Sequence, residues 1–498
     1  MFSTIKVPIP HAMCSIFVTL LTGLLVAASP GTSNSQTLTL KSAPPNPAFL
    51  DHAQARASGM QQTNTLSGRP LGHTPHPVGL SHAKRTQSTG AARAAALPRS
   101  YDIRRLGWVP PVRDQGDCGS CWTFGAMASV ESRLRQRGVA SNFSEADLNR
   151  YHGFDNAPCD GGNIWMSTAY FARWSGPVSE ADVPYPYAAV NSVVNATPGV
   201  KVRQHIQGVN FLPDRGTPTD NDTWKSAVMQ SGATDVSFMY DDAYYNEDTY
   251  SYWNGKDNGA NHEVAIIGWD DNYPKENFKS IEGQLPAGDG AFLIRNSWGA
   301  GWGNKGYFYI SYYDTSLQEA ASFKKIAAPT NYSHVYEYDH LGWVDSLGVP
   351  GYTTMWGANV FTASANARYI KAVSFYTTAE NTTVRIRIYK NLQNSSPTSG
   401  AFVGSVVTTF PFAGYHTVDF PTAMPVKALK KFSAVVSFTT QDYAYPLPVE
   451  YAYAGYSSAA TAYEGESFYS LDGTNWNDLT GFDPTANACI KVFANEAP

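Results

Sequence analysis

The sequence predicts two folded units in one chain, an α+β domain followed by an all-β domain. Between about residues 97 and 328, patterns typical of helices come first and patterns typical of strands follow, which indicates an α+β domain of two packed halves. Between residues 330 and 498, short strand-like runs alternate with turns rich in Gly, Pro, Asn and Asp, as in a β-sandwich or jelly roll. The chain has 498 residues, of which 43% are hydrophobic and 15% charged, and is therefore large and apolar enough to form both cores.

Three helices are expected in the first half of the α+β domain. Apolar and small residues recur at helical spacing from Trp122 to Gln136, and Gly138 provides a C-terminal stop. Ser144 stands three residues before an acidic residue, as an N-cap residue does, so a second helix is expected to begin there. A third helix is expected over residues 163–174.

Strands are expected after about Thr217 and throughout the second domain. In the α+β domain the apolar or alternating runs are Thr234–Tyr240, Glu263–Trp269, Ala291–Arg295 and Gly306–Tyr312. In the second domain they are Ala372–Tyr376, Thr383–Tyr389, Val403–Thr409, Phe432–Thr439 and Ile490–Phe493.

The first 28 residues have the features of an export signal. Lys6 supplies a positive charge, an apolar run follows from Ile16 to Val26, and Ala27-Ala28-Ser29 offers small residues for cleavage. The run is too short to favour a membrane span, and no later run approaches the necessary length. The mature protein is therefore expected to be soluble, without a transmembrane span, and secreted, periplasmic or extracellular.

Residues 29–96 predict a flexible pro-segment or linker, with one helical turn near Pro47–Ala55, because they are rich in Ser, Thr, Pro, Gly and Ala. Residues 1–97 hold seven basic residues and one acidic residue, although the whole chain has a net charge of −5. A basic leader suits a segment that docks on an acidic body before its removal, but a basic solvated tail explains the charge equally well. The negative net charge argues against nucleic acid as the main partner.

Four cysteines remain once the export signal, which contains Cys14, is removed: Cys118, Cys121, Cys159 and Cys489. Export implies an oxidising compartment, in which a pair of cysteines can form a bridge. A cysteine that stays reduced there needs a chemical reason.

Three motifs contain the residue types used in nucleophilic catalysis. Cys121 stands immediately before the first expected helix, where the helix dipole favours the thiolate. His262 begins an apolar strand that could hold an imidazole rigidly. A lone His at such a place is more often a partly buried residue without a catalytic role. Asn296 could accept the imidazole N–H, and Trp298 could cover that bond, although this Gly- and Trp-rich stretch also suits a tight turn with stacked rings.

Taken together, the motifs resemble those of the papain (C1) family of peptidases. The family has a glutamine, a Cys-Gly-Ser-Cys-Trp elbow, a distant histidine and an Asn-Ser-Trp-Gly motif in that order. This chain has Gln115, residues 118–122, His262 and residues 296–299 in the same order. The resemblance implies a two-lobed catalytic domain over residues 97–328, with a helical lobe and a β-barrel-like lobe.

The resemblance also implies a role for each matched residue. Cys121 would be the nucleophile, His262 the general base and then the acid, and Asn296 the residue that orients the imidazole. The Gln115 side chain and the Cys121 backbone N–H would stabilise the oxyanion. The implied function is a secreted cysteine endopeptidase that hydrolyses polypeptides through a Cys-His thiolate–imidazolium pair and an acyl-enzyme intermediate, without a cofactor or a metal.

Substrate-binding residues follow from the same resemblance: Gly119, Gly161, Gly162, Asn261, Glu263 and Trp298. The glycines would let the backbone of an extended substrate approach closely. Glu263 stands where the family commonly has a small residue that lines the second specificity pocket. We hypothesise that it shifts preference there towards a basic side chain; the alternative is that Glu263 turns to solvent.

Cys118 and Cys159 resemble the first disulfide of the family, which leaves Cys121 reduced. The second family bridge is expected to be absent because Tyr151 replaces one of its cysteines, and Cys489 is expected to be a buried thiol. The longer helical propeptide of the family is not found in residues 29–96, so the pro-segment is only a possible inhibitor. The second domain resembles the lectin-like domain of bacterial members, which implies a carbohydrate or cell-surface ligand.

Two other functions are compatible with parts of this pattern. A transglutaminase-like acyltransferase also uses Cys and His, but its third residue is normally Asp, where this chain has Asn296. A catalytically silent binding protein on the same scaffold is disfavoured by intact Cys121, His262 and Gln115. Titration with a thiol-alkylating epoxide, followed by a peptide amide assay, distinguishes these functions.

Overall fold

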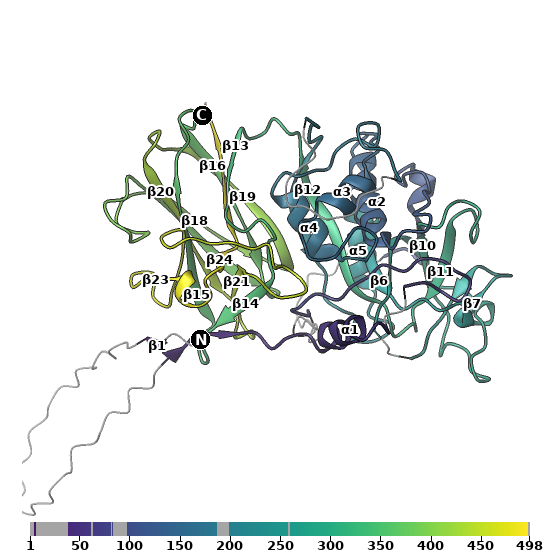
Figure 1. Cartoon of the computed structure of the whole chain (residues 1–498). Helices are drawn as coiled ribbons and strands as arrows, with labels where there is room; N and C mark the ends of the chain where they lie inside the picture. The colour runs from purple at the N-terminus through teal and green to yellow at the C-terminus, as the bar shows by residue number, and fades with distance from the viewer. Residues whose placement is uncertain are drawn as a thin grey trace, which may run out of the picture.

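The computed structural model describes residues 4–5, 38–60, 63–80, 82, 97–186, 199–256 and 259–496. The expected signal peptide over residues 1–28 and Cys14 lie outside these ranges, except for the backbone of β1 (Thr4–Ile5), which pairs with β2 (Leu38–Thr39). Figure 1 shows two halves side by side, one with the helices and the other built of strands. They correspond in order to the α+β and all-β parts that the sequence predicts.

The three expected helices are present as α2 (Cys121–Gln136), α3 (Glu145–Tyr151) and α4 (Ile164–Ala172). Ser144 caps α3, because its Oγ accepts a hydrogen bond of 3.0 Å from the backbone N–H of Asp147. Almost every residue of α2 is buried, since the helix packs between α3, α4 and the sheet. This burial fixes the N-terminus of α2, where Cys121 stands.

The structure corrects the prediction at α5 (Asp222–Ser231), which lies where only strands were expected. Trp224, Ala227 and Val228 recur at helical spacing and are buried against the sheet. Asp222 lies in the first turn, where a negative charge favours a helix. The helical period was therefore in the sequence, but the strand runs that follow it obscured it.

One sheet of the helix-containing half carries the site. Its strand order is β5-β12-β6-β9-β10-β11-β8-β7, with β4 paired to β9. The bounds are β4 (Ser100–Asp102), β5 (His205–Phe211), β6 (Thr234–Phe238), β7 (Tyr245–Asn246), β8 (Ser251–Tyr252), β9 (His262–Asp270), β10 (Ala291–Arg295), β11 (Tyr307–Ser311) and β12 (Gln318–Ala327). Within it, β9 pairs with β6 on one side and with β10 on the other, which brings His262 and the residues after Arg295 together.

The C-terminal half is a sandwich of antiparallel strands. One layer has the order β13-β25-β16-β19 and the other β18-β17-β20-β15-β22-β23, while β24, β21 and β14 form a smaller sheet. The bounds are β13 (His334–Tyr336), β14 (Asp345–Gly348), β15 (Thr354–Thr362), β16 (Tyr369–Thr377), β17 (Thr382–Lys390), β18 (Ala401–Phe410), β19 (Ala413–Pro425), β20 (Lys431–Thr439), β21 (Leu447–Glu450), β22 (Ser467–Ser470), β23 (Asn477–Asp478), β24 (Asn487–Ala488) and β25 (Ile490–Asn495). Each of the five strands expected in this half lies within one of these.

The two halves share a continuous sheet and a continuous core. Strand β5 of the first half pairs antiparallel with β19 of the second, with Phe211 opposite Ala413. Arg173, after α4, donates hydrogen bonds to the carbonyl oxygens of Tyr151 (2.5 Å) and of His340 (2.9 Å), and so joins the two halves. These shared contacts hold the halves in a fixed relative position.

Much of the expected flexible pro-segment is folded against both halves. Helix α1 (Pro47–Ala57) replaces the single expected turn, and β3 (Lys41–Ser42) adds a strand to β14. We call the described residues 38–60, 63–80 and 82 the strap; Figure 1 shows its purple part passing beneath both halves. Flexibility was the wrong prediction for these residues because their scattered apolar side chains, such as Phe49 and Leu80, are buried on the rest of the molecule.

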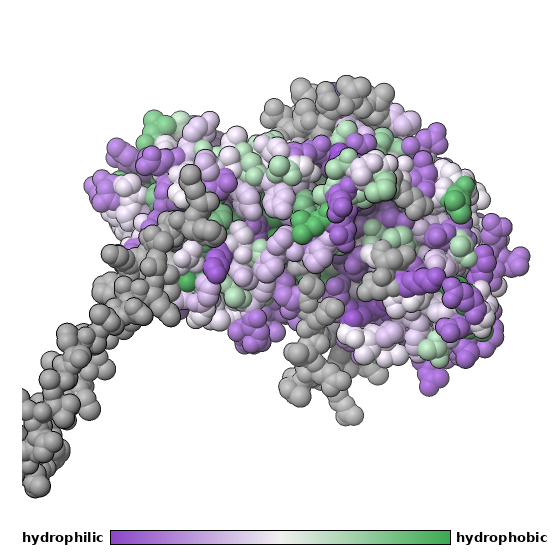
Figure 2. Space-filling model, turned by 60° about the horizontal axis from the view of Figure 1, so that its bottom comes forward, coloured by the Kyte–Doolittle hydropathy of each residue, from purple (hydrophilic) through white to green (hydrophobic). Residues whose placement is uncertain are grey.

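Among the described residues, no helix is long and apolar enough to cross a membrane. Figure 2 shows polar residues over most of one face and hydrophobic residues only in small separate patches. The large apolar side chains that are exposed, including Leu66, Phe402 and Tyr463, are distributed along the chain.

Candidate active site

Cys121 is fully buried at the first position of α2. Burial raises the pKa of its thiol to about 12, and backbone N–H groups of Glu263 and Gly72 partly offset this by hydrogen bonding to the sulfur. Since Glu263 directly follows His262, the first of these bonds places the thiol beside the start of β9. With the strap in place, the thiol is neutral at physiological pH.

The imidazole of His262 is held in one orientation by two neighbours. Its Nε2 lies 2.8 Å from Oδ1 of Asn296, and its ring stacks on Trp298 with a centroid distance of 4.5 Å. Because Nε2 donates to the amide oxygen, the lone pair of the neutral ring is on Nδ1, which has no hydrogen-bond partner among the described residues. Burial lowers the pKa of His262 to about 4, so the ring is a neutral base in this state.

Asn296 is itself fixed by the backbone around it. It follows β10, and its N–H donates to the carbonyl oxygen of Gly306 at 3.0 Å. Its Oδ1 also accepts a bond of 2.8 Å from the backbone N–H of Ser297. A rigid acceptor of this kind sets the tautomer of the imidazole.

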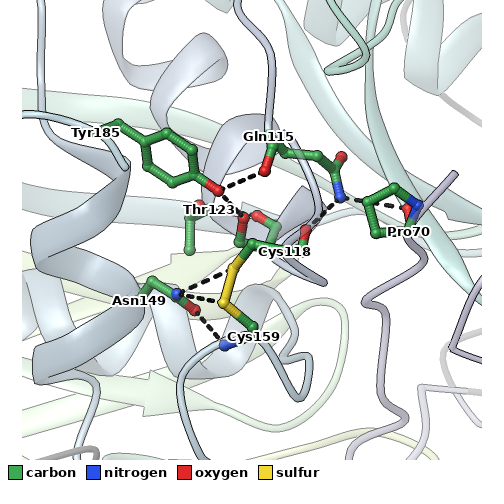
Figure 3. The surroundings of a disulfide bond; sticks show 8 residues. Pro70, Gln115, Cys118, Thr123, Asn149, Cys159 and Tyr185 are labelled. Carbon is green, nitrogen blue, oxygen red and sulfur yellow. Dashed lines mark hydrogen bonds between the residues drawn. A yellow bond between two sulfur atoms is a disulfide. The ribbon is translucent and has the colours of Figure 1, made fainter. Parts of the chain in front are cut away.

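The Gln115 side chain points its amide towards the cleft. Its Nε2 donates to the carbonyl oxygen of Cys118 at 2.8 Å and to that of Pro70, in the strap, at 3.3 Å. Figure 3 shows these two bonds together. Its Oε1 accepts a bond of 2.5 Å from the Ser297 hydroxyl, a positioning contact that sequence reasoning did not identify. Gln115 thus already presents an N–H to a carbonyl oxygen.

The structure contains a disulfide between Cys118 and Cys159, with the Cα atoms 4.7 Å apart. Asn149 Nδ2 lies against both sulfurs, at 3.5 and 3.9 Å (Figure 3). Cys121 and Cys489 are the free cysteines of the described residues, and both are buried. The thiol of Cys121 therefore stays free beside a bridged neighbour, as the resemblance implies.

Of the six residues expected to bind substrate, five contact the strap, and Trp298 packs on His262 instead. Thr74 donates its backbone N–H to the carbonyl oxygen of Gly162 at 2.9 Å, and Gly162 donates to the carbonyl oxygen of Gly72 at 2.9 Å. The Asn261 carbonyl oxygen accepts the N–H groups of Gly72 (3.1 Å) and His73 (3.0 Å). The strap backbone thus lies between Gly162 and Asn261, in the space that we call the cleft, with the Gly72 N–H against the thiol.

This close approach depends on glycine in the strap and in the walls of the cleft. A Cβ on Gly72 would lie 2.1 Å from the carbonyl oxygen of Gly119, far inside van der Waals contact. On Gly119, in the wall of the cleft, it would lie 2.7 Å from the carbonyl oxygen of Leu71 in the strap. Gly161, with φ of +96°, turns the chain just before Gly162.

A buried acidic pocket adjoins the thiol, and the structure excludes a solvent-facing Glu263. His73 of the strap fills this pocket, with Nδ1 3.2 Å from Oε2 of Glu263 and Nε2 3.3 Å from Oε2 of Glu319. Asp235 completes the cluster through a side-chain hydrogen bond to Glu263. Sequence reasoning missed Asp235 and Glu319, because only the pairing of β6 with β9 and β12 brings them together.

The carboxyl groups of this pocket hold protons while the strap is bound. Burial raises the pKa of Asp235 and of Glu319 to about 8, and burial together with the Asp235 carboxyl raises that of Glu263. Burial lowers the pKa of His73 to about 3. A neutral imidazole can donate or accept at Nδ1, so His73 can bond to Glu263 in either role.

Comparison with known proteins agrees with this geometry. The model of the papain family cysteine protease matches residues 97–325, and that of the lectin like domain matches residues 335–494. Cysteine proteinase 2 of Entamoeba histolytica is 30% identical over 242 residues, which are 46% of this chain and 69% of that protein. The chain belongs to the papain family of cysteine proteases.

Other members of the papain family match over shorter shares of their length. The oryzain gamma chain of Oryza sativa subsp. japonica is 33% identical over 227 residues, or 43% of this chain and 55% of that protein. This chain therefore spans about half the length of that relative.

Solved structures show the same two-part fold. The cysteine protease and lectin-like domains of Cwp84, a surface layer associated protein of Clostridium difficile, have 23% identity and a TM-score of 0.73, covering 92% of this chain and 98% of that one. A variant of Cwp84 with one cysteine replaced, solved after propeptide cleavage, has 25% identity and a TM-score of 0.68, covering 80% of this chain and 99% of that one. A papain-like catalytic half followed by a lectin-like β half is thus an arrangement found in a solved protein.

Proposed function

We propose that this papain-family protein is a secreted cysteine endopeptidase in which Cys121 and His262 perform the chemistry. The observation that carries the proposal is the orientation of His262, the first residue of β9. Its Nε2 is bonded to Asn296, while its Nδ1 has no hydrogen-bond partner among the described residues. The hydrogen bond from Glu263 to the thiol sulfur supports the adjacency of the two groups. Membership of the papain family supports proteolysis as the reaction.

The proposed reaction has two stages. His262 Nδ1 takes the thiol proton of Cys121, the sulfur bonds to the carbonyl carbon of the substrate, and the carbonyl electrons move to its oxygen. That oxygen accepts N–H groups from Gln115 and from the Cys121 backbone. The carbon–nitrogen bond then breaks, and the proton on His262 passes to the leaving amine. Water, deprotonated by His262, hydrolyses the resulting thioester and restores the thiol.

We propose further that the strap is an inhibitory pro-segment and the protein a zymogen. The backbone N–H of Gly72 in the strap bonds to the Cys121 sulfur, so the strap lies directly against the thiol. The strap also occupies the backbone positions of Gly162 and Asn261 that an extended substrate would use. In this scheme residues 1–28 are the signal peptide, 29–96 the pro-segment, 97–328 the peptidase domain and 330–498 the lectin-like domain.

The acidic pocket supports a preference for a basic substrate side chain. Glu263 and Glu319 meet at His73 of the strap, Asp235 is bonded to Glu263, and removal of the strap opens the space beside these three carboxyl groups. An Arg or Lys side chain would neutralise them and donate hydrogen bonds. Peptide substrates that differ only at this side chain test the preference: faster cleavage of Arg than of Leu is expected, and equal rates would contradict it.

The experiment for the main proposal is alkylation with an epoxide inhibitor followed by a peptide amide assay. The strap-free protein is expected to be labelled at Cys121 and to lose hydrolysis in proportion. The variant Cys489→Ser is the control, because its thiol is buried in the other half and labelling should not change. Amine incorporation without hydrolysis would indicate an acyltransferase, and labelling without any turnover a silent binding protein.

For the C-terminal half we propose attachment to a carbohydrate or another cell-surface ligand. The match to the lectin like domain supports this, as does the description of Cwp84 as surface layer associated. The same observations support an extracellular site of action. Sedimentation of the protein with purified cell envelopes, with and without competing soluble polysaccharide, is the test; a protein that stays in the supernatant would contradict it.

A further inference from the structure

Both ends of the strap are attached to the C-terminal half, and only its middle crosses the catalytic cleft. At the first end, Leu40 is fully buried in the sandwich core, in the cluster that contains Leu347. The adjoining β3 pairs with β14, and Ala43 donates its N–H to the carbonyl oxygen of Ser346 at 2.8 Å. This end of the strap thus consists of a buried apolar side chain, Leu40, which we call the plug, and of a strand added to β14.

The second end is held by His82. Its Nε2 lies 2.7 Å from the carbonyl oxygen of Thr378, and its ring stacks on Tyr443 at 3.7 Å with an interplanar angle of 9°. Both contacts are to the C-terminal half. Both ends of the strap therefore bind to the C-terminal half.

Between these ends, two aromatic contacts attach the strap to the seam between the halves. His76 is completely buried, donates from Nε2 to the carbonyl oxygen of Trp343 at 2.9 Å and stacks on Trp165 at 4.4 Å. Phe49 of α1 packs edge-on against Tyr453 (5.4 Å) and Tyr456 (5.8 Å).

The two arms of the strap are also joined to each other beside the cleft. Asn46 donates its backbone N–H to the carbonyl oxygen of Pro77 at 2.7 Å and its side-chain amide to that of His76 at 3.0 Å. The strap is consequently a closed loop fastened to the C-terminal half, and its residues 70–75 are presented to the cleft.

We propose that the C-terminal half carries a binding surface for the strap, which we call the track and which consists of its contacts with Leu40, β3, Phe49, His76 and His82. The C-terminal half retains the strap on this surface after the chain is cut between residues 82 and 97. Every contact described above lies before the cut and survives it. The cut removes only the covalent link between the strap and the rest of the chain. Loss of this link lowers the effective concentration of the strap but removes no contact. The partner that fits this track is an extended peptide with an apolar plug, one strand that augments β14, and flat rings for the aromatic seam.

The functional consequence rests on the proposed peptidase activity: the cut protein is a two-fragment complex that remains inhibited until the strap leaves the track. Activation then has two separate steps, the cut and the release. The C-terminal half governs the second of them, although it supplies none of the residues proposed for the chemistry.

The first arm of the test measures retention without catalysis. A recognition sequence for a specific protease replaces part of residues 83–96 in full-length Cys121→Ala protein, which is cut and passed over a size-exclusion column at micromolar concentration. The fragment that carries the strap is expected to elute with the main body, as identified by mass. Leu40→Asp, which puts a charge into the sandwich core, is expected to release the fragment at least tenfold more readily. The matched control is Leu66→Asp, at a strap position that is 88% exposed.

The second arm measures inhibition in protein that keeps Cys121. After the cut, hydrolysis of a peptide amide is expected to stay at least tenfold below the rate reached once the strap is displaced. Elution of the strap as a free fragment, or equal retention of Leu40→Asp and Leu66→Asp, overturns the proposal. If Leu40→Asp fails to fold, Tyr443→Ala at the second end replaces it. Retention without hydrolysis in any state would refute the peptidase and leave the track intact.

Discussion

The catalytic cleft and the C-terminal half hold the same strap in different ways. In the cleft the bonds are between backbone atoms, from residues 72–74 to Gly162 and Asn261. On the C-terminal half and its seam the holding groups are mainly side chains, namely Leu40, Phe49, His76 and His82. Backbone bonds are available to any extended peptide, whereas side-chain sockets recognise one sequence. On the proposed function, the cleft serves both inhibitor and substrate, while the second half gives the strap its selectivity.

The largest expected effect comes from removing a side-chain contact to the C-terminal half. Phe49→Ala loses a ring that is 5% exposed, and such losses cost about 3–5 kcal/mol, or at least about 150-fold in affinity. Retention of the strap after the cut, measured by size exclusion over a concentration series, should weaken accordingly. Met60→Ala, at a strap residue that is 74% exposed, should leave retention unchanged. An equal effect of both would remove the distinction between the two modes of binding.

Breaking the backbone contacts in the cleft should have the next largest effect. In Gly72→Ala the new Cβ would collide with the carbonyl group of Gly119, and overpacking of this kind costs about 1–3 kcal/mol. We expect alkylation of Cys121 in the uncut chain to become about 5- to 150-fold faster, while the strap stays on the C-terminal half. The control is Leu66→Ala. An unchanged alkylation rate would mean that the cleft contacts do not shield the thiol.

His73 is the exception to the comparison, since it is a strap side chain that is recognised in the cleft. In Glu319→Gln the acidic pocket loses one of the two carboxyl groups that contact it. The ratio of kcat/KM values for Arg and Leu substrates should fall by about tenfold, as expected for one charge-assisted hydrogen bond worth about 1.5 kcal/mol. Glu282→Gln, at an exposed carboxylate, should not change the ratio. A preserved ratio in Glu319→Gln would exclude this pocket as the source of specificity.

The smallest effect near neutral pH is a pH dependence that arises at the seam. Burial lowers the pKa of His76 from 6.5 to about 4 in the bound strap, so the released strap takes up a proton that the bound one cannot. The stabilisation from neutral His76 is therefore complete above pH 6.5 and is lost as the pH falls towards 4, by at most tenfold per pH unit.

His76→Gln, which keeps a donor for the Trp343 carbonyl but does not titrate, should remove this one-proton slope. The ring contacts described for His76 are Trp165, Trp343 and Tyr456, none of them a carboxylate. Protons held by His73 and the acidic pocket contribute to both proteins and cancel in the comparison. Identical slopes of log Kd against pH in the two proteins would show that His76 is not a proton-linked contact.

The sequence sufficed to locate the residues that we propose react, because each stands at the end of a strongly patterned element. Cys121 begins α2, His262 begins β9 and Asn296 follows β10, so finding these elements positions their side chains. The strands of the sandwich were equally accessible, since turns punctuate them regularly.

What the sequence did not reveal depends on contacts between distant segments. Asp235 and Glu319 join Glu263 only through strand register, which leaves no mark on the local pattern. The strap has the composition of a flexible chain, and it is ordered because single residues such as Leu40 and Phe49 enter sockets made elsewhere. Those sockets cannot be recognised before the halves are folded.

The most direct test of the closed, strap-inhibited peptidase is the rate of Cys121 alkylation before and after strap removal, followed on intact protein by mass spectrometry. We expect slow labelling of the uncut chain, and rapid labelling with one adduct at Cys121, accompanied by peptide amide hydrolysis, once the strap has been displaced. Equal labelling rates in both states, or an adduct at Cys489 instead, would contradict the claim that this chain is a cysteine peptidase closed by its own strap.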